Sequence, residues 1–307
     1  MTGEKKSSSE LFYVQDLRKV CPACDREEDV SIHKGFAFYW GVFPHAGVRI
    51  VSMNDVKALE DSIASYRGTA ILHLGDLGLM TKPKPRYKVG QPSAAFDSMD
   101  IDKTVSGCRR LFTNNLYEKI HDKIHPLPLG IYRKEIADFA NLRQNKKEKF
   151  CYANFSLTNR YRFSVLQWAA DQNYIDCLFT KRFSDWDDQL DSKYFSEPLT
   201  LQEFWSTLAS YKFCIVPNGV GIDTERLWEC IFMNVVPIVQ NNYGNRIFSK
   251  IWPMILVDRY ETSDIQNMAT EFEKQYGKNI QYNHDLLLRE NLPELLDRIE
   301  YECKRET

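Results

Sequence analysis

One stretch of the sequence, residues 212–239, contains two short apolar runs separated by a glycine-containing loop and an amphipathic segment. The first run ends at Val216, and the second, rich in β-branched residues, begins at Val235. Short apolar runs bounded by turn residues are typical of buried strands, and the segment between them has the apolar spacing of a helix. The stretch therefore predicts a strand, a helix and a second strand within a parallel α/β sheet.

The loop after the first predicted strand has the residue types of an anion-binding turn. Gly219 and Gly221 let the backbone approach a ligand closely, and Asp223 or Thr224 is expected to cap the helix that follows. Amide groups at such a helix start suit a phosphate. Two glycines at this spacing also fit an ordinary turn, with Asp223 as a helix cap and nothing more.

Arg226 and Glu229 lie three residues apart and therefore on one face of the predicted helix. There the guanidinium can bind a diphosphate, and the carboxylate can accept hydrogen bonds from two ribose hydroxyls. The alternative is a salt bridge on the helix surface. The residues expected on the opposite, core-facing side are Leu227, Trp228, Ile231 and Phe232.

The stretch from Phe213 to Val239 resembles the signature of the exostosin-like (family 47) glycosyltransferases. The matching residues are Lys212, Phe213, Pro217, Gly219, Gly221, Asp223, Thr224, Arg226, Trp228, Glu229, Pro237, Ile238 and Val239. The sequence departs from the family at Asn218, where Arg or Ser is frequent, and at Asn234, where Gly is usual. Residues 123–131 and 154–162 resemble two further elements of the family, the second of which places Arg162 near the diphosphate or, alternatively, in solvent.

The resemblance implies a GT-B architecture, an α/β fold of two facing Rossmann-like domains with a C-terminal helical tail. The implied parts are an acceptor-side domain over 11–131, a nucleotide-sugar-binding domain over 132–283, and a tail over 284–307 that packs back on the first domain. The Lys- and Ser-rich residues 1–10 are expected to be disordered. The implied nucleotide-sugar site consists of Arg162, Asn218, Gly219, Gly221, Asp223, Thr224, Arg226 and Glu229.

Three further segments have local patterns that predict secondary structure. Residues 116–122 are expected to form a helix, and 284–305 a helical tail broken around Pro293. Thr200 and Glu203 have the spacing of a capping box and predict the start of a helix that runs to Ser210.

Two sequence motifs have metal-ligand types, but neither predicts a metal site. Asp100-Ile101-Asp102 has the DxD form of metal-dependent transferases, yet no apolar strand precedes it, so we interpret it as a coincidence in a loop. Cys21 and Cys24 form a single CxxC without the second pair that a zinc site needs. We therefore expect backbone amides, Arg226 and Arg162 to neutralise the diphosphate, with no metal and no obligatory cofactor.

Inverting sugar transfer needs a general base that takes the proton from the acceptor hydroxyl. In GT-B enzymes this base usually lies in the N-terminal domain, in a loop after a strand. Asp76, just after the apolar run 70–74, fits this position best, and His45 is second, ahead of Asp55 and His73. Each has a structural alternative: Asp76 as a turn residue and His45 as a hydrogen-bonded loop residue.

The resemblance, together with these patterns, implies an inverting, metal-independent glycosyltransferase that moves a sugar from a UDP-sugar to a hydroxyl of a glycan or glycoprotein acceptor. The alternative is a non-catalytic protein that binds a nucleotide or a glycan. A net charge of −2 gives no electrostatic reason to expect nucleic acid or a membrane as partner, which also disfavours a DNA-modifying transferase. The oligomeric state is not specified by the sequence.

The expected compartment follows from the cysteines and from hydropathy. The eight cysteines are scattered, as reduced thiols are, and no apolar run approaches the about 20 residues of a membrane span. We therefore expect a soluble, cytoplasmic protein, unlike the anchored Golgi members of the exostosin-like family. In this respect the chain is similar to glycosyltransferases encoded by large DNA viruses, some of which use UDP-xylose, so UDP-xylose is the expected donor.

Overall fold

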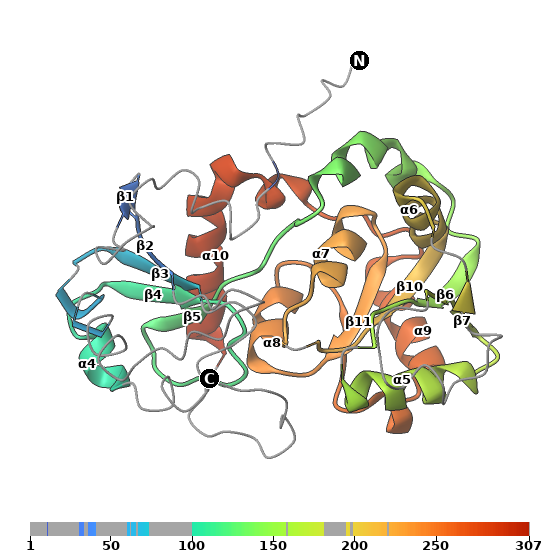
Figure 1. Ribbon diagram of the computed structural model, residues 1–307, viewed down its shortest axis with the longest axis horizontal. Coiled ribbons are helices and arrows are strands. Elements are labelled where there is room, and N and C mark those ends of the chain that lie inside the picture. Colours follow the sequence, from blue (N-terminus) through green and yellow to red (C-terminus); the bar gives the residue numbers. More distant parts are fainter. Residues whose placement is uncertain are drawn as a thin grey trace. The chain divides into compact units, whose positions relative to one another are not determined.

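A computed structural model describes two α/β units (Figure 1). It describes residues 11, 31–33, 36–40, 60–61, 63–65, 67–73, 100–157, 159–180, 195–196, 199–219 and 221–306. Unit 1 comprises the described parts of Met1–Phe12, Gly130–Asn241 and Phe248–Glu294. Unit 2 comprises those of Tyr13–Leu129, Asn242–Ile247 and Leu295–Thr307.

Unit 1 is built around a five-stranded sheet in which every pair of neighbours is parallel. Its strands are β6 (Lys149–Ala153), β7 (Ile175–Cys177), β10 (Tyr211–Val216), β11 (Val236–Gln240) and β12 (Ile255–Val257). Across the sheet the order is β12-β11-β10-β6-β7, so the first strand in the chain lies between the second and the third. This is the strand order of a doubly wound fold, and its direction of winding reverses between β6 and β10.

Helices cover both faces of this sheet because successive side chains of its strands point to opposite sides. Phe213 and Ile215 of β10 pack in one apolar cluster with buried residues of α5 (Arg160–Ala170) and α9 (Ile265–Tyr276). On the other side, Cys214 lies against Cys230 of α7 (Glu225–Phe232). The remaining elements of unit 1 are η3 (Lys134–Gln144), β8 (Phe179–Thr180), β9 (Phe195–Ser196), α6 (Leu201–Ala209), η6 (Tyr260–Thr262), η7 (His284–Leu287) and η8 (Arg289–Asn291).

Local sequence signals explain where two of these helices begin and end. The predicted capping box is present at the start of α6, where Thr200 and Glu203 exchange hydrogen bonds. Helix α7 ends at Phe232; two residues later Asn234 has a φ of 56°, and the amides of Asn234 and Val235 donate to the carbonyls of Ile231 and Cys230. This is a Schellman motif, and Asn tolerates its left-handed residue better than other non-glycine types. The asparagine at position 234 is thus compatible with the backbone for which the family usually has Gly.

Unit 2 contains a second five-stranded sheet, in the order β1-β2-β3-β4-β5. The pair β1–β2 is antiparallel and the other three pairs are parallel. The strands are β1 (Ser31–His33), β2 (Phe36–Trp40), β3 (Thr69–His73), β4 (Arg110–Thr113) and β5 (Ile124–Pro126), and α4 (Ile101–Val105) precedes β4. Helices α8 (Tyr243–Ser249) and α10 (Leu292–Arg305) each contribute residues to this unit.

A buried arginine joins α10 to the sheet of unit 2. The guanidinium of Arg110 on β4 bonds the carboxylates of Asp297 (2.6 Å) and Glu300 (2.5 Å), and its Nε donates to Thr69 Oγ1 on β3. The side chain of Arg110 is only 5% exposed, so its charge needs these partners. The C-terminal helix therefore supplies the counter-ions of a buried charge in the N-terminal sheet.

The structure confirms the predicted α/β class with parallel sheets and a C-terminal helix. The roles and boundaries expected for the two domains stay predictions. Within the described ranges, no helix combines the length and apolarity that a membrane crossing needs.

One local prediction was wrong. Residues 116–122 are not helical, because the carbonyls of Leu116 and Tyr117 accept hydrogen bonds from Gly244 and Tyr243 instead of from their own segment. The tail over 284–305 is interrupted near Pro293, as predicted: η7 and η8 precede α10, and Pro293 occupies the first turn of α10, where the missing amide hydrogen is tolerated.

Glu300→Gln tests the charge pairing that holds α10. Burial disfavours the charged carboxylate, but hydrogen bonds from Lys304 and Arg110 outweigh burial and lower the pKa of Glu300 to about 2. A lowered folded-state pKa stabilises the fold above the ordinary value of 4.5, and this stability is lost as the pH falls toward 2. We expect the difference in free energy of unfolding between wild type and Glu300→Gln to shrink from pH 5 to pH 3 in urea titrations.

The matched control for this titration is Glu294→Gln, which removes an exposed carboxylate from the same helix. Its difference from wild type should change little over the same range. A Glu300→Gln difference that stays constant from pH 5 to pH 3 would contradict the pairing.

Candidate functional site

The topology of unit 1 selects one end of its sheet as the place for a ligand. In doubly wound sheets, ligands bind beyond the carboxyl ends of the strands at the point where the winding reverses. Here that point lies after Ala153 of β6 and Val216 of β10. The segments that follow these strands, 154–159 and 217–223, contain many of the residues that the sequence singled out.

Arg162, in the first turn of α5, holds the loop after β10. Its Nε donates to the carbonyl of Asn218 (2.9 Å), Nη2 to that of Pro217 (3.1 Å) and Nη1 to that of Ser156 (2.9 Å). The residue is buried, so it does not face solvent. Its observed role is to fix the glycine-containing loop against β6, and direct contact with a diphosphate stays a prediction.

Gly219 packs closely against the guanidinium of Arg162. A Cβ atom built on Gly219 would lie 2.9 Å from Nη2 of Arg162, closer than real Cβ contacts. Two hydrogen bonds fix the same backbone: Asn159 Nδ2 donates to the carbonyl of Gly219 (2.9 Å), and the Gly219 amide donates to the carbonyl of Gly221 (2.8 Å). The glycine thus allows loop and arginine to touch.

Arg226 and Glu229 form a buried pair on α7 instead of an exposed surface salt bridge. Arg226 Nε lies 2.9 Å from Glu229 Oε2, and the two side chains are 16% and 6% exposed. The guanidinium also donates to the carbonyl oxygen of Asn154, at the end of β6, and lies 4.4 Å from the ring centre of Phe204 on α6. Burial alone would lower the pKa of Arg226, but the neighbouring Glu229 carboxylate raises it above its ordinary value. Arg226 is therefore a fixed positive charge.

The two residues at the start of α7 differ in what they do. Asp223 Oδ1 accepts a hydrogen bond of 2.8 Å from the indole nitrogen of Trp228, and both side chains are buried. Thr224 occupies the N-cap position, but its side chain makes no capping bond. Among the described residues, the buried Thr224 hydroxyl has no hydrogen-bond partner.

Asn154 and Asn159 belong to this site, although neither was among the predicted binding residues. Asn154 contacts Arg226 through its backbone carbonyl, and its side-chain Nδ2 donates to the carbonyl of Leu178. Asn159 caps α5 by accepting from the Arg162 amide and also bonds Gly219. An Asn just before an amphipathic segment is a helix-capping signal that could have identified Asn159.

Several predicted residues cannot be placed in this site. Asp76, His45, Asp55, Cys21 and Cys24 lie outside the described residues. His73 is the last residue of β3, and its side chain is not described.

The DxD motif has a structural role at Asp100. Asp100 is the N-cap of α4, and its carboxylate accepts from the amide of Lys103.

The arrangement brings together a fixed guanidinium, a buried carboxylate and a rigid glycine-containing loop at the carboxyl end of one sheet. A guanidinium suits phosphate oxygens, and a carboxylate suits vicinal hydroxyls. The described part of the site therefore combines the two charge types that suit a nucleoside diphosphate.

Comparisons with known proteins add little to this geometry. No protein-family model and no curated protein matches the chain. An α,α-trehalose-phosphate synthase (UDP-forming) from Burkholderia vietnamiensis has 9% sequence identity and a TM-score of 0.41, with 87% of this chain and 69% of that chain covered. The N-terminal domain of Candida albicans trehalose-6-phosphate phosphatase has 12% sequence identity and a TM-score of 0.36, with 83% of this chain and 77% of that chain covered. A GtfA/B complex has 10% sequence identity and a TM-score of 0.27, with 82% of this chain and 59% of that chain covered. These likenesses are too distant to carry an argument about activity, and membership of the exostosin-like family stays a prediction.

Arg162→Met tests whether Arg162 holds the loop. The substitution removes three hydrogen bonds to buried carbonyls, so we expect it to lower the free energy of unfolding by about 2–4 kcal/mol in urea titrations. Arg162→Lys should retain only a minor part of the stability that Arg162→Met loses, because an ammonium cannot reproduce the planar arrangement of donors.

Arg160→Met is the control, since Arg160 is an exposed residue of the same helix, and it should change stability by no more than about 0.5 kcal/mol. If Arg162→Met were as stable as wild type, the guanidinium would not be needed to hold the loop.

Proposed function

We propose that the chain is an inverting glycosyltransferase that uses a UDP-sugar without a metal ion and transfers the sugar to a hydroxyl of a glycan or glycoprotein. The observation that carries the proposal is the buried Arg226–Glu229 pair, which lies where a doubly wound sheet binds its ligands. The resemblance of residues 213–239 to the exostosin-like signature points in the same direction.

In this proposal each charged group of the site has a partner on the donor. Arg226 binds the diphosphate, and backbone amides at the start of α7 contribute partial positive charge. Glu229 accepts the ribose hydroxyls, while Arg162 keeps the loop of Asn218, Gly219 and Gly221 in position. Thr224 offers a buried hydroxyl beside the same helix start. These fixed donors take the place of a divalent cation.

The reaction needs one more group, a base on the acceptor side. The base removes the proton of the acceptor hydroxyl, whose oxygen bonds to the anomeric carbon as the bond from that carbon to the diphosphate breaks. UDP departs with the bonding electrons, and Arg226 stabilises its charge. We propose Asp76 for the base, with His45 as the second candidate, within a GT-B arrangement of facing domains. We also propose UDP-xylose as the donor and a soluble, cytoplasmic location.

A non-catalytic nucleotide- or glycan-binding protein is the second candidate. It is favoured by one observation: all three side-chain nitrogens of Arg226 have protein partners, Glu229 or Asn154, within 3.5 Å. A guanidinium satisfied in this way fits a structural role as well as a ligand-binding one.

Glu229→Gln tests the donor site without introducing a cavity. A glutamine keeps the size of the side chain but loses the charge that strengthens hydrogen bonds to ribose hydroxyls. We therefore expect the binding of UDP and of uridine to weaken by about tenfold each. Inorganic diphosphate should be affected less than either nucleoside ligand. Calorimetry with the three ligands gives the comparison.

The control is Glu271→Gln, which removes an exposed carboxylate of α9 that pairs with Lys274. It should leave all three dissociation constants unchanged. If folded Glu229→Gln bound UDP as wild type does, Glu229 would serve only to pair Arg226, and the proposed ribose contact would be wrong.

Turnover separates an enzyme from a binding protein. We expect nucleotide release from UDP-xylose to exceed release from UDP-glucose, UDP-galactose, UDP-N-acetylglucosamine, UDP-glucuronate and GDP-sugars, and to persist in EDTA. Asp76→Asn should lower this turnover by about 10²–10⁴-fold with UDP affinity unchanged, because a base acts in the transition state.

His45→Ala is the parallel variant in this assay. Loss of turnover in His45→Ala with normal turnover in Asp76→Asn would transfer the role of base to His45. Micromolar UDP binding without turnover of any donor would establish the non-catalytic alternative, and an EDTA-sensitive activity restored by manganese would refute metal independence.

A further inference from the structure

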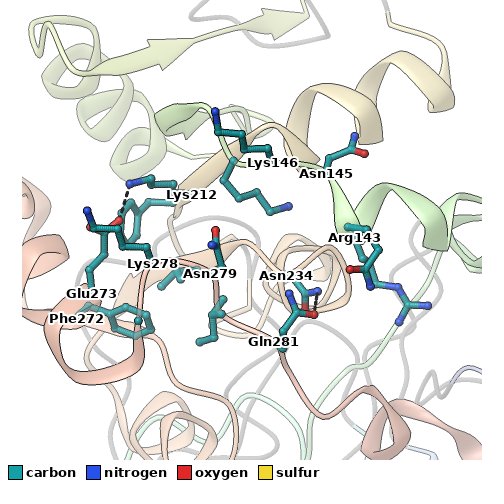
Figure 2. A pocket seen from close by; sticks show the side chains of 16 residues that line it. Arg143, Asn145, Lys146, Lys212, Asn234, Phe272, Glu273, Lys278, Asn279 and Gln281 are labelled. Carbon is teal, nitrogen blue, oxygen red and sulfur yellow. Dashed lines mark hydrogen bonds and ion pairs between the residues drawn. The ribbon is translucent and has the colours of Figure 1, made fainter.

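A cavity of about 320 Å³ opens at the opposite end of the unit 1 sheet from the proposed donor site. It lies beside Lys212 and Phe213 at the start of β10 and Val236 at the start of β11. Two segments contribute most of the remaining wall: residues 143–147, from the end of η3 toward β6, and residues 277–281, after α9. Figure 2 shows side chains of both segments around the cavity. A volume of this size accommodates a small-molecule ligand.

The lining of this cavity is strongly biased toward hydrogen-bond donors and positive charge. It contains five basic side chains and one carboxylate, Glu273, together with five side-chain amides. The basic residues are Arg143, Lys146, Lys147, Lys212 and Lys278. The amides are Gln144, Asn145, Asn234, Asn279 and Gln281.

Part of this charge has a structural explanation, because helices of a parallel sheet direct their carbonyl ends toward the amino ends of the strands. Cations at helix C-termini are stabilising. Lys147 has this role: its Nζ donates to the carbonyls of Ala209 (2.7 Å) and Met233 (2.8 Å), at the ends of α6 and α7. Lys212 pairs with Glu273 at 2.7 Å.

The charge that remains is not compensated within the described part of the chain. Among the described residues, Arg143 and Lys278 have no carboxylate within ion-pair distance. Lys146 has one at 3.8 Å, Glu148, but both side chains are largely exposed, so solvent screens this pair. Lys147 adds little to this remaining charge, because burial lowers its pKa to about 8 and its ammonium already donates to two carbonyls.

Arg143 is positioned in advance of any ligand. Its guanidinium lies 4.6 Å from the ring centre of Phe232, and its Nε donates to the carbonyl of Ala140 at 3.0 Å. These two contacts fix the plane of the guanidinium and therefore reduce the conformational entropy lost on binding. On another side, Phe213, Val236 and Phe272 provide an apolar wall.

We propose that this cavity is a second binding site, which takes a small molecule with clustered phosphate charges. Multiple phosphate oxygens match the excess of ammonium, guanidinium and amide donors, and the apolar wall accommodates a compact organic part of the molecule. The site is formed by unit 1 alone and lies at the other end of its sheet from the Arg226–Glu229 pair. It does not depend on the proposed transferase activity.

Inorganic triphosphate is the probe that tests the site. Calorimetry at 150 mM NaCl and pH 7 should show saturable binding to wild type, and Lys146→Glu/Lys278→Glu should weaken it about tenfold or more. Both lysines are exposed, so the variant is expected to fold, which circular dichroism verifies. The matched control is Lys274→Glu, an exposed lysine of α9 that does not line the cavity, and it should bind as wild type does.

Amide NMR of the ¹⁵N-labelled protein locates the bound triphosphate. Shifts at Gly277, Lys278 and Asn279 would support the proposal, whereas shifts confined to Gly219 and Gly221 would assign the anion to the donor end and overturn it. Equal binding by wild type and the double variant, or no binding by wild type, would also overturn it. Citrate is the second arm: binding as tight as triphosphate would refute the preference for phosphate. UDP affinity should be the same in the double variant and in wild type. A negative result with triphosphate would therefore leave the proposed donor site untouched, and a negative result with UDP would leave this proposal untouched.

Discussion

The organisation of unit 1 depends on a cation that the fold buries. Arg226 is largely removed from solvent, and a buried guanidinium requires several acceptors. Its partners come from different elements: Glu229 from α7, the Asn154 carbonyl from the end of β6, and the Phe204 ring from α6. Losing one partner of such a pair typically costs about 3–5 kcal/mol, so the three elements constrain one another. The geometry of the sheet end is thus set before any ligand arrives.

The two ends of the sheet solve opposite electrostatic problems. At the carboxyl end, Arg162 donates to the carbonyls of the loop that follows β10, and α7 presents its amino terminus. At the amino end, Lys147 neutralises the carbonyls at the ends of α6 and α7. Both residues are basic and both bond backbone oxygens. Arg162 holds a loop in place, whereas Lys147 lies at a cavity whose other lining residues carry an excess of positive charge. The direction of the helices in a parallel sheet explains the basic side chain at the amino end, where the helices present their carbonyls. At the carboxyl end, Arg162 is explained by the loop carbonyls that it bonds.

Much of the fold was predictable because its signals are local. The capping box at Thr200 and the buried face of α7 both follow from patterns within a few residues. The failure over 116–122 is non-local: these residues have a helical pattern, but their carbonyls bond the start of α8, which the sequence did not reveal. The partners of Arg162 and Arg226 were also not predictable from local patterns, because they are distant in sequence and can be recognised as neighbours only when the order of the strands in the sheet is known. Sequence patterns predicted the loop after β10 and the start of α7 as a binding site, and this stays a prediction; the contacts among these residues required the structure.

The contact of Arg110 with α10 has a consequence for biosynthesis. Arg110 and Asp297 are separated by 187 residues, so the ribosome synthesises the carboxylates that pair with Arg110 long after it has synthesised β4. At typical rates of synthesis this interval is roughly 10–40 s. During that time the amino-terminal sheet carries a guanidinium without its carboxylates. Folding of unit 2 during synthesis is therefore expected to finish only after α10 has been made, because unit 2 includes residues from that helix.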